Sequence, residues 1–442
     1  MDTGTPALLT DHYELTMVAA ALRSGAADRR CVFEVFGRSL PGRRRYGVVA
    51  GLGRLLDTLP RFTFDAAALA FLAQTTTLDR PTREWLAAYR FTGTIHAYAE
   101  GEVYFPGSPV LTVEGTFAEC VVLETLILSI LNHDSAVATA AARMTAAAGD
   151  RPCIEMGSRR THEVAAVASA RAAYIGGFAA SSNLAAGARW GIPTMGTAAH
   201  AFTLVHDDER SAFAAQVDAL GPGTTLLVDT YDVERGIRTA VEVAGPDLGA
   251  IRLDSGDLPT QARNARTLLD ELGATKTRIV VTSDLDEFAI AGLASAPVDA
   301  YGVGTSLVTG SGEPTAGFVY KLAEYAEPGG SPVPVAKRSV GKVSFGGRKI
   351  GVRRYDGNGV ARAEVLGVDG PPAPAVAPDR VLQSTVFSAG SVVGNHGLEA
   401  ARTRCRDSIG ELPLAAMKLS AGDPAIPTHY EGGTSVQEDA GR

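Results

Sequence analysis

The sequence predicts an α/β protein whose parallel strands form a barrel, because one short pattern recurs through the central part of the chain. An apolar stretch runs into a polar or glycine-rich tip at 225–232, 250–257, 278–284 and 300–306. These stretches are separated by about the length of one helix and two loops, as in consecutive strand–helix units. Since parallel strands end at one edge, we expect carboxylates, an arginine and a glycine loop to share one rim, where α/β proteins bind ligands.

The second of these units shows the pattern most clearly. Residues 250–253 are expected to end a buried strand, and a helix is expected to follow Asp257 and to stop at Gly273. The Asp257 carboxylate is expected to cap that helix, because it can accept hydrogen bonds from the free N–H groups of the first turn. The loop between strand and helix therefore carries one cation, Arg252, beside the anions Asp254 and Asp257.

An earlier segment, 151–162, repeats the change from apolar strand to charged tip. Its adjacent Arg159 and Arg160 could clamp a phosphate or a carboxylate, because each guanidinium offers a planar fork of donors. The structural alternative is that they pair with a nearby glutamate, Glu155 or Glu163.

Two further strand ends carry smaller polar groups. Residues 176–183 indicate a short strand that ends in hydroxyl and amide groups, among them Ser182, and residues 196–202 place Thr197 and His200 on another strand-end loop. A lone histidine is more often structural, but at a polar rim it can act as a base or a nucleophile.

Composition limits the class of protein. A chain of 442 residues with 45% hydrophobic content can bury a sizeable core and has room for two domains. A net charge of -8 argues against nonspecific binding to nucleic acid, and four scattered cysteines without a C-x-x-C pair argue against disulfides or a structural metal. The N-terminus lacks a signal peptide pattern, and the most apolar run, 120–131, is short for a bilayer, so we expect a cytoplasmic protein.

The N-terminal part predicts an α+β domain over residues 1–117. Residues 10–24 have the pattern of a capped helix, and Tyr13 in its first turn is either a core contact or a binding residue. Residues 31–36 read as a strand, and short extended pieces at 94–113, broken by Gly and Pro, are typical of an antiparallel sheet. Arg38 begins an arginine-rich loop, which is either a solvated face or an anion site.

The other boundaries follow from changes of pattern. Thr116 and Glu119 have the spacing of a capping box, which opens a helical region that is expected to break at 132–134 and to resume as far as Ala148. We therefore expect the barrel domain to span 118–325.

Beyond Lys321 hairpins replace the strand–helix pattern, most clearly at 348–366, so 326–430 is expected to be β-rich. The polar end, 431–442, is expected to be a disordered tail.

Taken together, these segments resemble the nicotinate phosphoribosyltransferases, a family of the type II phosphoribosyltransferase group. Each match is weak alone, but all occur in family order, at 10–17, 33–38, 157–160, 177–183, 196–200, 228–232, 252–257 and 301–305. The resemblance implies an irregular barrel with a sandwich domain built from N-terminal and C-terminal segments. It also implies a homodimer with shared active sites, in which helix 10–24 packs at the interface.

The implied reaction is displacement of pyrophosphate from phosphoribosyl pyrophosphate by nicotinate, giving nicotinate mononucleotide for NAD biosynthesis, with coupled ATP hydrolysis. By the same resemblance Tyr13 stacks on the pyridine ring, Arg252 holds the nicotinate carboxylate with help from Thr197, and His200 is phosphorylated by ATP. Met156 stands where relatives often have an aromatic residue, and Ala201 where many have Ser or Glu.

The remaining roles agree with the chemistry of such a reaction. Positive charge develops at the ribose C1, and three carboxylates are candidates to stabilise it or to hold Mg²⁺ directly or through waters, namely Asp229, Asp254 and Asp284. Phosphate groups are expected to bind to arginines and to the backbone N–H groups of a glycine turn, namely Arg38, Arg159, Arg160, Gly302, Gly304 and Thr305.

Ser182 favours nicotinate over nicotinamide, because relatives that use the amide carry an aspartate near this position, which would repel a carboxylate. The alternatives are a nicotinamide or quinolinate phosphoribosyltransferase and a non-catalytic phosphometabolite sensor. An unrelated metal-dependent lyase on a barrel would also use rim carboxylates, but it would not account for Tyr13 or for residues 196–200.

Overall fold

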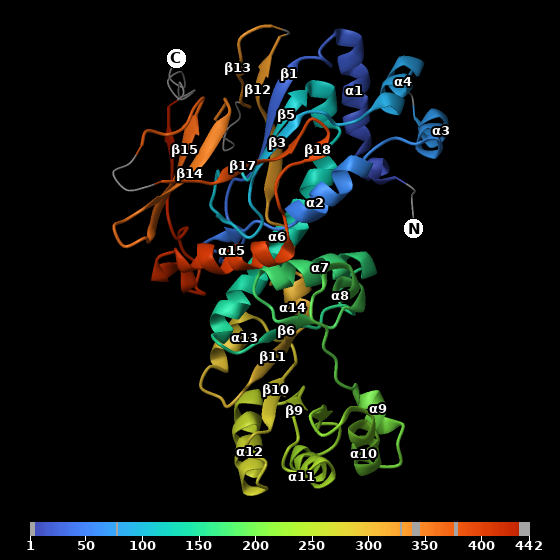
Figure 1. Ribbon diagram of the computed structural model, residues 1–442, viewed down its shortest axis with the longest axis vertical. Coiled ribbons are helices and arrows are strands. Elements are labelled where there is room, and N and C mark those ends of the chain that lie inside the picture. The colour runs from blue at the N-terminus through green and yellow to red at the C-terminus, as the bar shows by residue number, and fades with distance from the viewer. Residues whose placement is uncertain (1–4, 77, 328, 338–344, 375–378, 433–442) are drawn as a thin grey trace. The chain divides into compact units, whose positions relative to one another are not determined.

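The chain forms two compact units, which Figure 1 shows as a ribbon. The computed structural model describes residues 5–76, 78–327, 329–337, 345–374 and 379–432. One unit comprises residues 1–136 and 315–442, and the other comprises 137–314. We call them the sheet unit and the barrel unit.

These boundaries differ from the expected 117/118 and 325/326. Helix α6 (Glu124–Ala148) is continuous, and its first half, including Leu126 and Ile130, belongs to the hydrophobic core of the sheet unit. Strand β12 (Phe318–Ala326) pairs with β1 (Arg30–Gly37), so the chain has already returned to the sheet unit by residue 318.

The expected break at 132–134 is absent because its polar side chains make tertiary contacts. The Asn132 side chain accepts a hydrogen bond from the backbone N–H of Phe318 (2.8 Å), and Asp134 pairs with Arg54 (2.7 Å). By length and composition, the helical stretch 117–148 is long and apolar enough to cross a membrane, in contrast to the expectation for 120–131. Its most apolar part is 67% buried, as in the core helix of a globular protein.

The sheet unit combines both ends of the chain in one antiparallel sheet, as expected. Its seven strands lie in the order β13 (Val333–Pro334), β12, β1, β5 (Leu111–Thr116), β3 (Thr94–Tyr98), β17 (Gln383–Ser388) and β18 (Ser391–Val392). A second sheet has the order β16 (Arg380–Val381), β14 (Lys349–Tyr355), β15 (Ala361–Val368) and β19 (Thr428–Glu431), and β14 and β15 form the expected hairpin. A short pair, β2 (Gly47–Val48) and β4 (Val103–Tyr104), completes the strands described in this unit.

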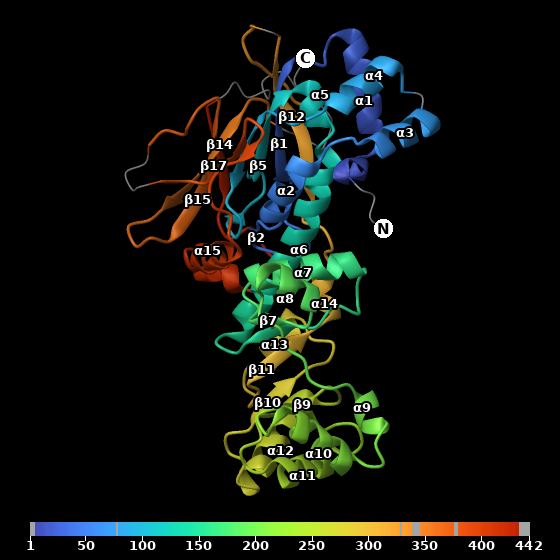
Figure 2. The same ribbon diagram turned by 45° about the vertical axis from the view of Figure 1, so that its right-hand side comes forward.

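The two larger sheets face each other as layers (Figure 2). Glu34 of β1 binds Lys349 of β14 at 2.7 Å, and the Tyr98 hydroxyl of β3 donates to Glu364 of β15 at 2.7 Å. Strand β19 includes Glu431, the first residue of the segment expected to be disordered, whereas 433–442 lie outside the described residues.

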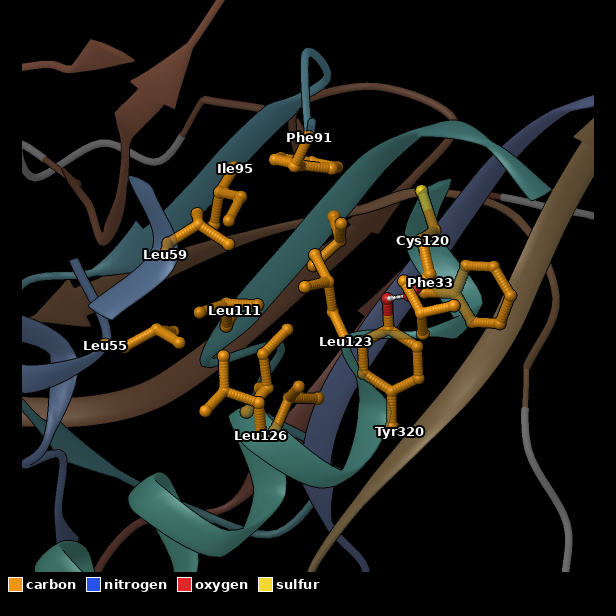
Figure 3. Close-up of a cluster of buried hydrophobic side chains, with 14 of the residues drawn as sticks. Phe33, Leu55, Leu59, Phe91, Ile95, Leu111, Cys120, Leu123, Leu126 and Tyr320 are labelled. Atoms are coloured by element: carbon orange, nitrogen blue, oxygen red, sulfur yellow. Dashed lines mark hydrogen bonds between the residues drawn. The ribbon is translucent and has the colours of Figure 1, made fainter. Parts of the chain in front are cut away.

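Helices cover the sheet unit and fill its core. They are α1 (His12–Ser24), α2 (Leu52–Thr58), α3 (Ala66–Thr75), α4 (Arg80–Ala88), α5 (Phe117–Val121) and α15 (Leu398–Gly410). The predicted capping box opens α5, where Thr116 and Glu119 satisfy each other's backbone N–H groups. Figure 3 shows the core, in which Phe33 stacks on Tyr320 with ring centroids 4.8 Å apart and the Tyr320 hydroxyl donates to the Cys120 carbonyl (2.9 Å).

The barrel unit contains one curved parallel sheet, which confirms the predicted irregular barrel. Its six strands lie in the order β7 (Ala180–Ser181), β6 (Cys153–Glu155), β11 (Ala300–Val303), β10 (Arg278–Val281), β9 (Ala250–Leu253) and β8 (Thr225–Leu227). Within the described ranges, no ladder joins β8 back to β7, so the barrel is open there.

Helices follow the strands of this sheet. They are α7 (Glu163–Ile175), α8 (Leu184–Trp190), α9 (His200–Leu204), α10 (Glu209–Leu220), α11 (Val233–Ala244), α12 (Leu258–Glu271), α13 (Glu287–Gly292) and α14 (Thr305–Val308). Helix α12 packs on β9 and β10, as Figure 1 shows.

Helix α12 begins after Asp257 and is followed by Gly273 at φ +77°, as predicted. The expected cap is wrong, because the Asp257 side chain makes no capping hydrogen bond. Pro259 occupies the second helical position and has no N–H, which removes one of the two donors that a capping carboxylate uses.

Candidate active site

A cleft of about 580 Å³ opens at the carboxyl ends of the parallel strands in the barrel unit. Its walls come from the tips after β6, β7, β9, β10 and β11 and from the loop before α9. The sequence-predicted residues that line it are Met156, Arg159, Arg160, Ser182, Thr197, Arg252, Asp254, Asp284, Gly302, Gly304 and Thr305. The common rim therefore forms as expected from parallel strands ending at one edge.

Arg252 is fixed in this cleft by a neighbouring loop. Its Nη1 donates to the Thr197 hydroxyl and to the Ala198 carbonyl (3.1 Å), while Nη2 lies 3.7 Å from Asp254 Oδ1. Burial lowers the pKa of Arg252 from its usual range, and Asp254 and Asp229 oppose that shift. The Nε atom is buried without a hydrogen-bond partner in the described structure. Arg252 is thus a partly desolvated cation, which favours binding of a carboxylate.

Asp229 and Asp254 are linked through the backbone of the β9 tip. Asp229 Oδ2 accepts hydrogen bonds from the Asp254 N–H (2.8 Å) and the Ser255 hydroxyl (2.9 Å), and Asp254 Oδ1 accepts one from the Thr282 hydroxyl. The Asp229 side chain is only 1% exposed, so this carboxylate orients the tip and Asp254 is the one at the cleft.

His200, the first residue of α9, lies beside both carboxylates. Its Nε2 is 3.9 Å from Asp229 Oδ1 and 3.9 Å from Asp254 Oδ2, and its Nδ1 lies 3.1 Å from the Thr230 hydroxyl. The ring is 39% exposed, so it is held in place on one side and open to solvent on the other.

The comparisons with known proteins agree with this geometry. The chain is 60% identical over 436 residues to a nicotinate phosphoribosyltransferase of Mycobacterium tuberculosis, covering 97% of this chain and 96% of that protein. The chain belongs to the nicotinate phosphoribosyltransferase family. Residues 8–132 also match the model of the nicotinate phosphoribosyltransferase N-terminal domain.

Two more distant relatives extend the match. A nicotinate phosphoribosyltransferase of Bacillus subtilis is 39% identical over 331 residues, which cover 73% of this chain and 67% of that protein. The crystal structure of human nicotinic acid phosphoribosyltransferase superimposes with a TM-score of 0.83 at 26% identity, covering 96% of this chain and 97% of that one. The family resemblance and the irregular barrel expected from the sequence are therefore confirmed.

Gly302, in the glycine turn, packs closely against two side chains of the cleft wall. A Cβ at residue 302 would lie 2.5 Å from Thr282 Cγ2 and 2.7 Å from Met156 Sδ, so only glycine fits there without displacing the wall. Arg159 and Arg160 are exposed at the cleft, and within the described part of the chain neither forms an ion pair. The alternative that they pair with Glu155 or Glu163 is not realised.

Asp284 is exposed at the cleft, and its carboxylate has no hydrogen-bond or ion-pair partner among the described residues. The preceding Ser283 has φ +137°, a backbone conformation that is strained for any residue except glycine. Ser283 and Thr282 both line the cleft and were not singled out in the sequence, although their position directly after a strand was a usable signal.

Two predicted site residues belong to the sheet unit, and their roles stay predictions. Tyr13 on α1 is 46% exposed, and burial together with Glu124 and Glu14 raises the pKa of its phenol. Arg38 directly follows β1 and is exposed.

Proposed function

We propose that this chain transfers the phosphoribosyl group of phosphoribosyl pyrophosphate to nicotinate, producing nicotinate mononucleotide and pyrophosphate. The observation that carries the proposal is the desolvated Arg252, clamped by Thr197 at the rim that also carries Arg159, Arg160 and a free carboxylate. Such a rim offers separate cationic groups for a pyridine carboxylate and for phosphates.

The reaction makes a bond from the pyridine nitrogen to ribose C1 and breaks the bond from C1 to the pyrophosphate oxygen. The pyridine nitrogen needs no deprotonation, so the site requires alignment and charge stabilisation more than a strong base. Asp254, which lines the cleft and whose backbone N–H is bound by Asp229, would stabilise positive charge at C1. Arg159, Arg160 and the turn of Gly302, Gly304 and Thr305 would bind the phosphates.

Ser182 supports the choice of nicotinate over nicotinamide. Its backbone N–H donates to the Glu155 carbonyl (2.8 Å), and the residue lines the cleft. A serine here introduces no negative charge opposite a substrate carboxylate, whereas an aspartate would repel it. Met156 would supply an apolar, polarisable surface for the pyridine ring.

We further propose that ATP hydrolysis is coupled to the reaction through His200. A ring nitrogen would attack the γ-phosphorus of ATP, ADP would leave, and water would later hydrolyse the phosphohistidine. The Thr230 hydroxyl and the two carboxylates restrict the ring to one orientation, which suits a nucleophile that must meet a bound phosphate.

Mg²⁺ fits the donor set of the cleft, because the available carboxylate oxygens are hard ligands of the kind it prefers. Asp254 and Asp284 would hold it through waters, and when bound it would neutralise charge on the departing pyrophosphate. By family analogy the enzyme would work in the cytoplasm as a homodimer with shared sites, to which Tyr13 and Arg38 would contribute.

An assay of pyrophosphate release tests the proposal. Purified protein would be given phosphoribosyl pyrophosphate with nicotinate, nicotinamide or quinolinate, each with and without ATP. We expect release with nicotinate, faster with ATP, and little with the other two. Release with nicotinamide or quinolinate alone would contradict the substrate assignment, and tight binding without turnover would favour a sensor.

A further inference from the structure

Glu155, the last residue of β6, is a buried carboxylate that directly precedes Met156 of the cleft wall. Its side chain is fully buried, and both oxygens accept hydrogen bonds: Oε1 from the Gly157 backbone N–H and Oε2 from the Ser181 hydroxyl. Within the described part of the chain no cation pairs with it. Burying a carboxylate without a counter-ion costs free energy. The two hydrogen-bond donors offset part of this cost, so they fix the position of the side chain.

These two donors belong to different strand ends. Gly157 begins the β6 tip that continues into Arg159 and Arg160, whereas Ser181 ends β7 and precedes Ser182. The Glu155 carbonyl also accepts a hydrogen bond from the Ser182 N–H (2.8 Å). Glu155 therefore holds the arginine tip, residues 157–160, with its side chain. It holds the serine tip, residues 181–183, with both its side chain and its backbone.

Further hydrogen bonds stiffen the same junction. The Ser181 hydroxyl accepts one from the Asn183 N–H (2.9 Å), and the Asn183 side chain donates to the Ser158 hydroxyl (3.0 Å). Only glycine fits at position 157 without displacing its neighbours, because a Cβ there would collide with Val308 Cγ1. The network leaves the two tips little freedom to move independently.

We propose that Glu155 is a positioning residue that sets the spacing between the arginine tip and the serine tip, and so controls binding of both substrates. This inference rests on the proposed function, in which the arginine tip binds phosphoribosyl pyrophosphate and Ser182 faces the pyridine. A glutamine at this position could keep both links, because its amide nitrogen can donate to the Ser181 hydroxyl, whereas an alanine could accept neither hydrogen bond. In Glu155→Ala both tips would lose this link while the strand ladder stayed intact.

The test compares Glu155→Ala, Ser181→Ala and a control, Glu209→Gln, in the full-length chain. Glu209 is a second buried glutamate of the same unit, on α10, and its oxygens have no hydrogen-bond partner among the described residues. For Glu155→Ala we expect KM to rise about 10-fold for both phosphoribosyl pyrophosphate and nicotinate, with kcat changed less. For Ser181→Ala we expect a smaller rise, of roughly 3-fold, mainly in KM for nicotinate.

Hydrogen exchange supplies a readout that does not depend on turnover. The amides of Gly157 and Asn183 should exchange faster in Glu155→Ala than in the parent protein, whereas Glu209→Gln should leave their exchange and both KM values unchanged. A role confined to folding would lower the melting temperature and the amount of active enzyme without moving either KM.

Each outcome decides one question. Unchanged KM values and unchanged exchange in Glu155→Ala would overturn the inference. If that variant does not fold, an unchanged KM for nicotinate in Ser181→Ala would do the same. Failure of the parent protein to release pyrophosphate with nicotinate would refute the proposed function instead, and the exchange data would still show whether Glu155 holds the two tips.

Discussion

Arg252 donates hydrogen bonds to the Thr197 hydroxyl and to the carbonyl of Ala198 (3.1 Å), although Thr197 lies 55 positions away in sequence. This contact joins the end of β9 to the loop that precedes α9. Since the arginine side chain is only 13% exposed, the loop holds a cation that water solvates poorly. A carboxylate arriving in the cleft would restore the lost solvation.

Replacing Arg252 with alanine should weaken nicotinate binding. Loss of a charge-assisted hydrogen bond costs about 1.5–3 kcal/mol, so KM for nicotinate should rise by roughly 10- to 100-fold, with a smaller change for phosphoribosyl pyrophosphate. Thr197→Val is the matched control, which keeps the cation but loses its support and should raise the same KM only a few-fold. An unchanged value in Arg252→Ala would move carboxylate binding to Arg159 or Arg160. Initial-rate kinetics with each substrate varied would decide.

Replacing His200 with asparagine should separate nucleotide synthesis from ATP. The variant should accept no radiolabel from the γ-phosphate of ATP, because the nucleophilic imidazole is gone. Slow synthesis of nicotinate mononucleotide without ATP should remain. Thr230→Val is a milder change that removes the hydroxyl near Nδ1 and should slow labelling without abolishing it. Undiminished ATP coupling in His200→Asn would refute the assignment of the phosphorylated residue.

The buried Glu209 should make the free energy of unfolding depend on pH. Burial raises the pKa of its carboxyl, with Arg235 opposing the shift and Asp232 adding to it. The fold thus favours the protonated form, so this contribution to stability is complete below the unfolded-state pKa and is lost as pH rises through the folded-state value. Glu209→Gln should therefore be more stable than the parent by roughly 1 kcal/mol at pH 7.

The difference in the free energy of unfolding between Glu209→Gln and the parent protein should become smaller toward pH 4. Urea unfolding midpoints of both proteins, measured between pH 4 and pH 8, would show it. A difference that did not change with pH would mean that Glu209 is solvated or paired.

In the sheet unit, Arg353 should be essential for stability. Its guanidinium is fully buried between Glu102 (3.4 Å) and Glu364 (2.9 Å), and Phe105 lies against it. Arg353→Met would remove the cation that pairs with the buried Glu364 and would leave Glu102 with Arg380 (2.5 Å), at a cost of about 3–5 kcal/mol. Thermal unfolding of the variant would measure this.

The control for Arg353→Met is Arg362→Met on the neighbouring strand β15. Arg362 pairs with Asp356 at 2.6 Å, but its side chain is 62% exposed. Surface pairs of this kind contribute about 0–1 kcal/mol, because water competes for both charges. Equal losses of stability in the two variants would contradict the importance of the buried network.

The sequence by itself determined the kind of structure and much of the cleft. Apolar stretches ending in polar tips predicted the parallel strands, and because such strands all end at one edge, Arg252, Asp254 and Gly302 were expected at a common rim, where the structure places them. The capping box at Thr116 and the hairpin at 348–366 were also correct, since the hydrogen bonds that define them are local.

Only the tertiary structure decided how distant segments meet. The pairing of β11 between β6 and β10, the continuity of α6 through Asn132 and the burial of Glu155 under two strand ends all depend on contacts between residues far apart in the chain. A polar residue has the same local pattern whether it turns the chain, faces solvent or bonds to a remote backbone group. Its role is settled by the partners that folding brings to it, and those partners are not written in its sequence neighbourhood.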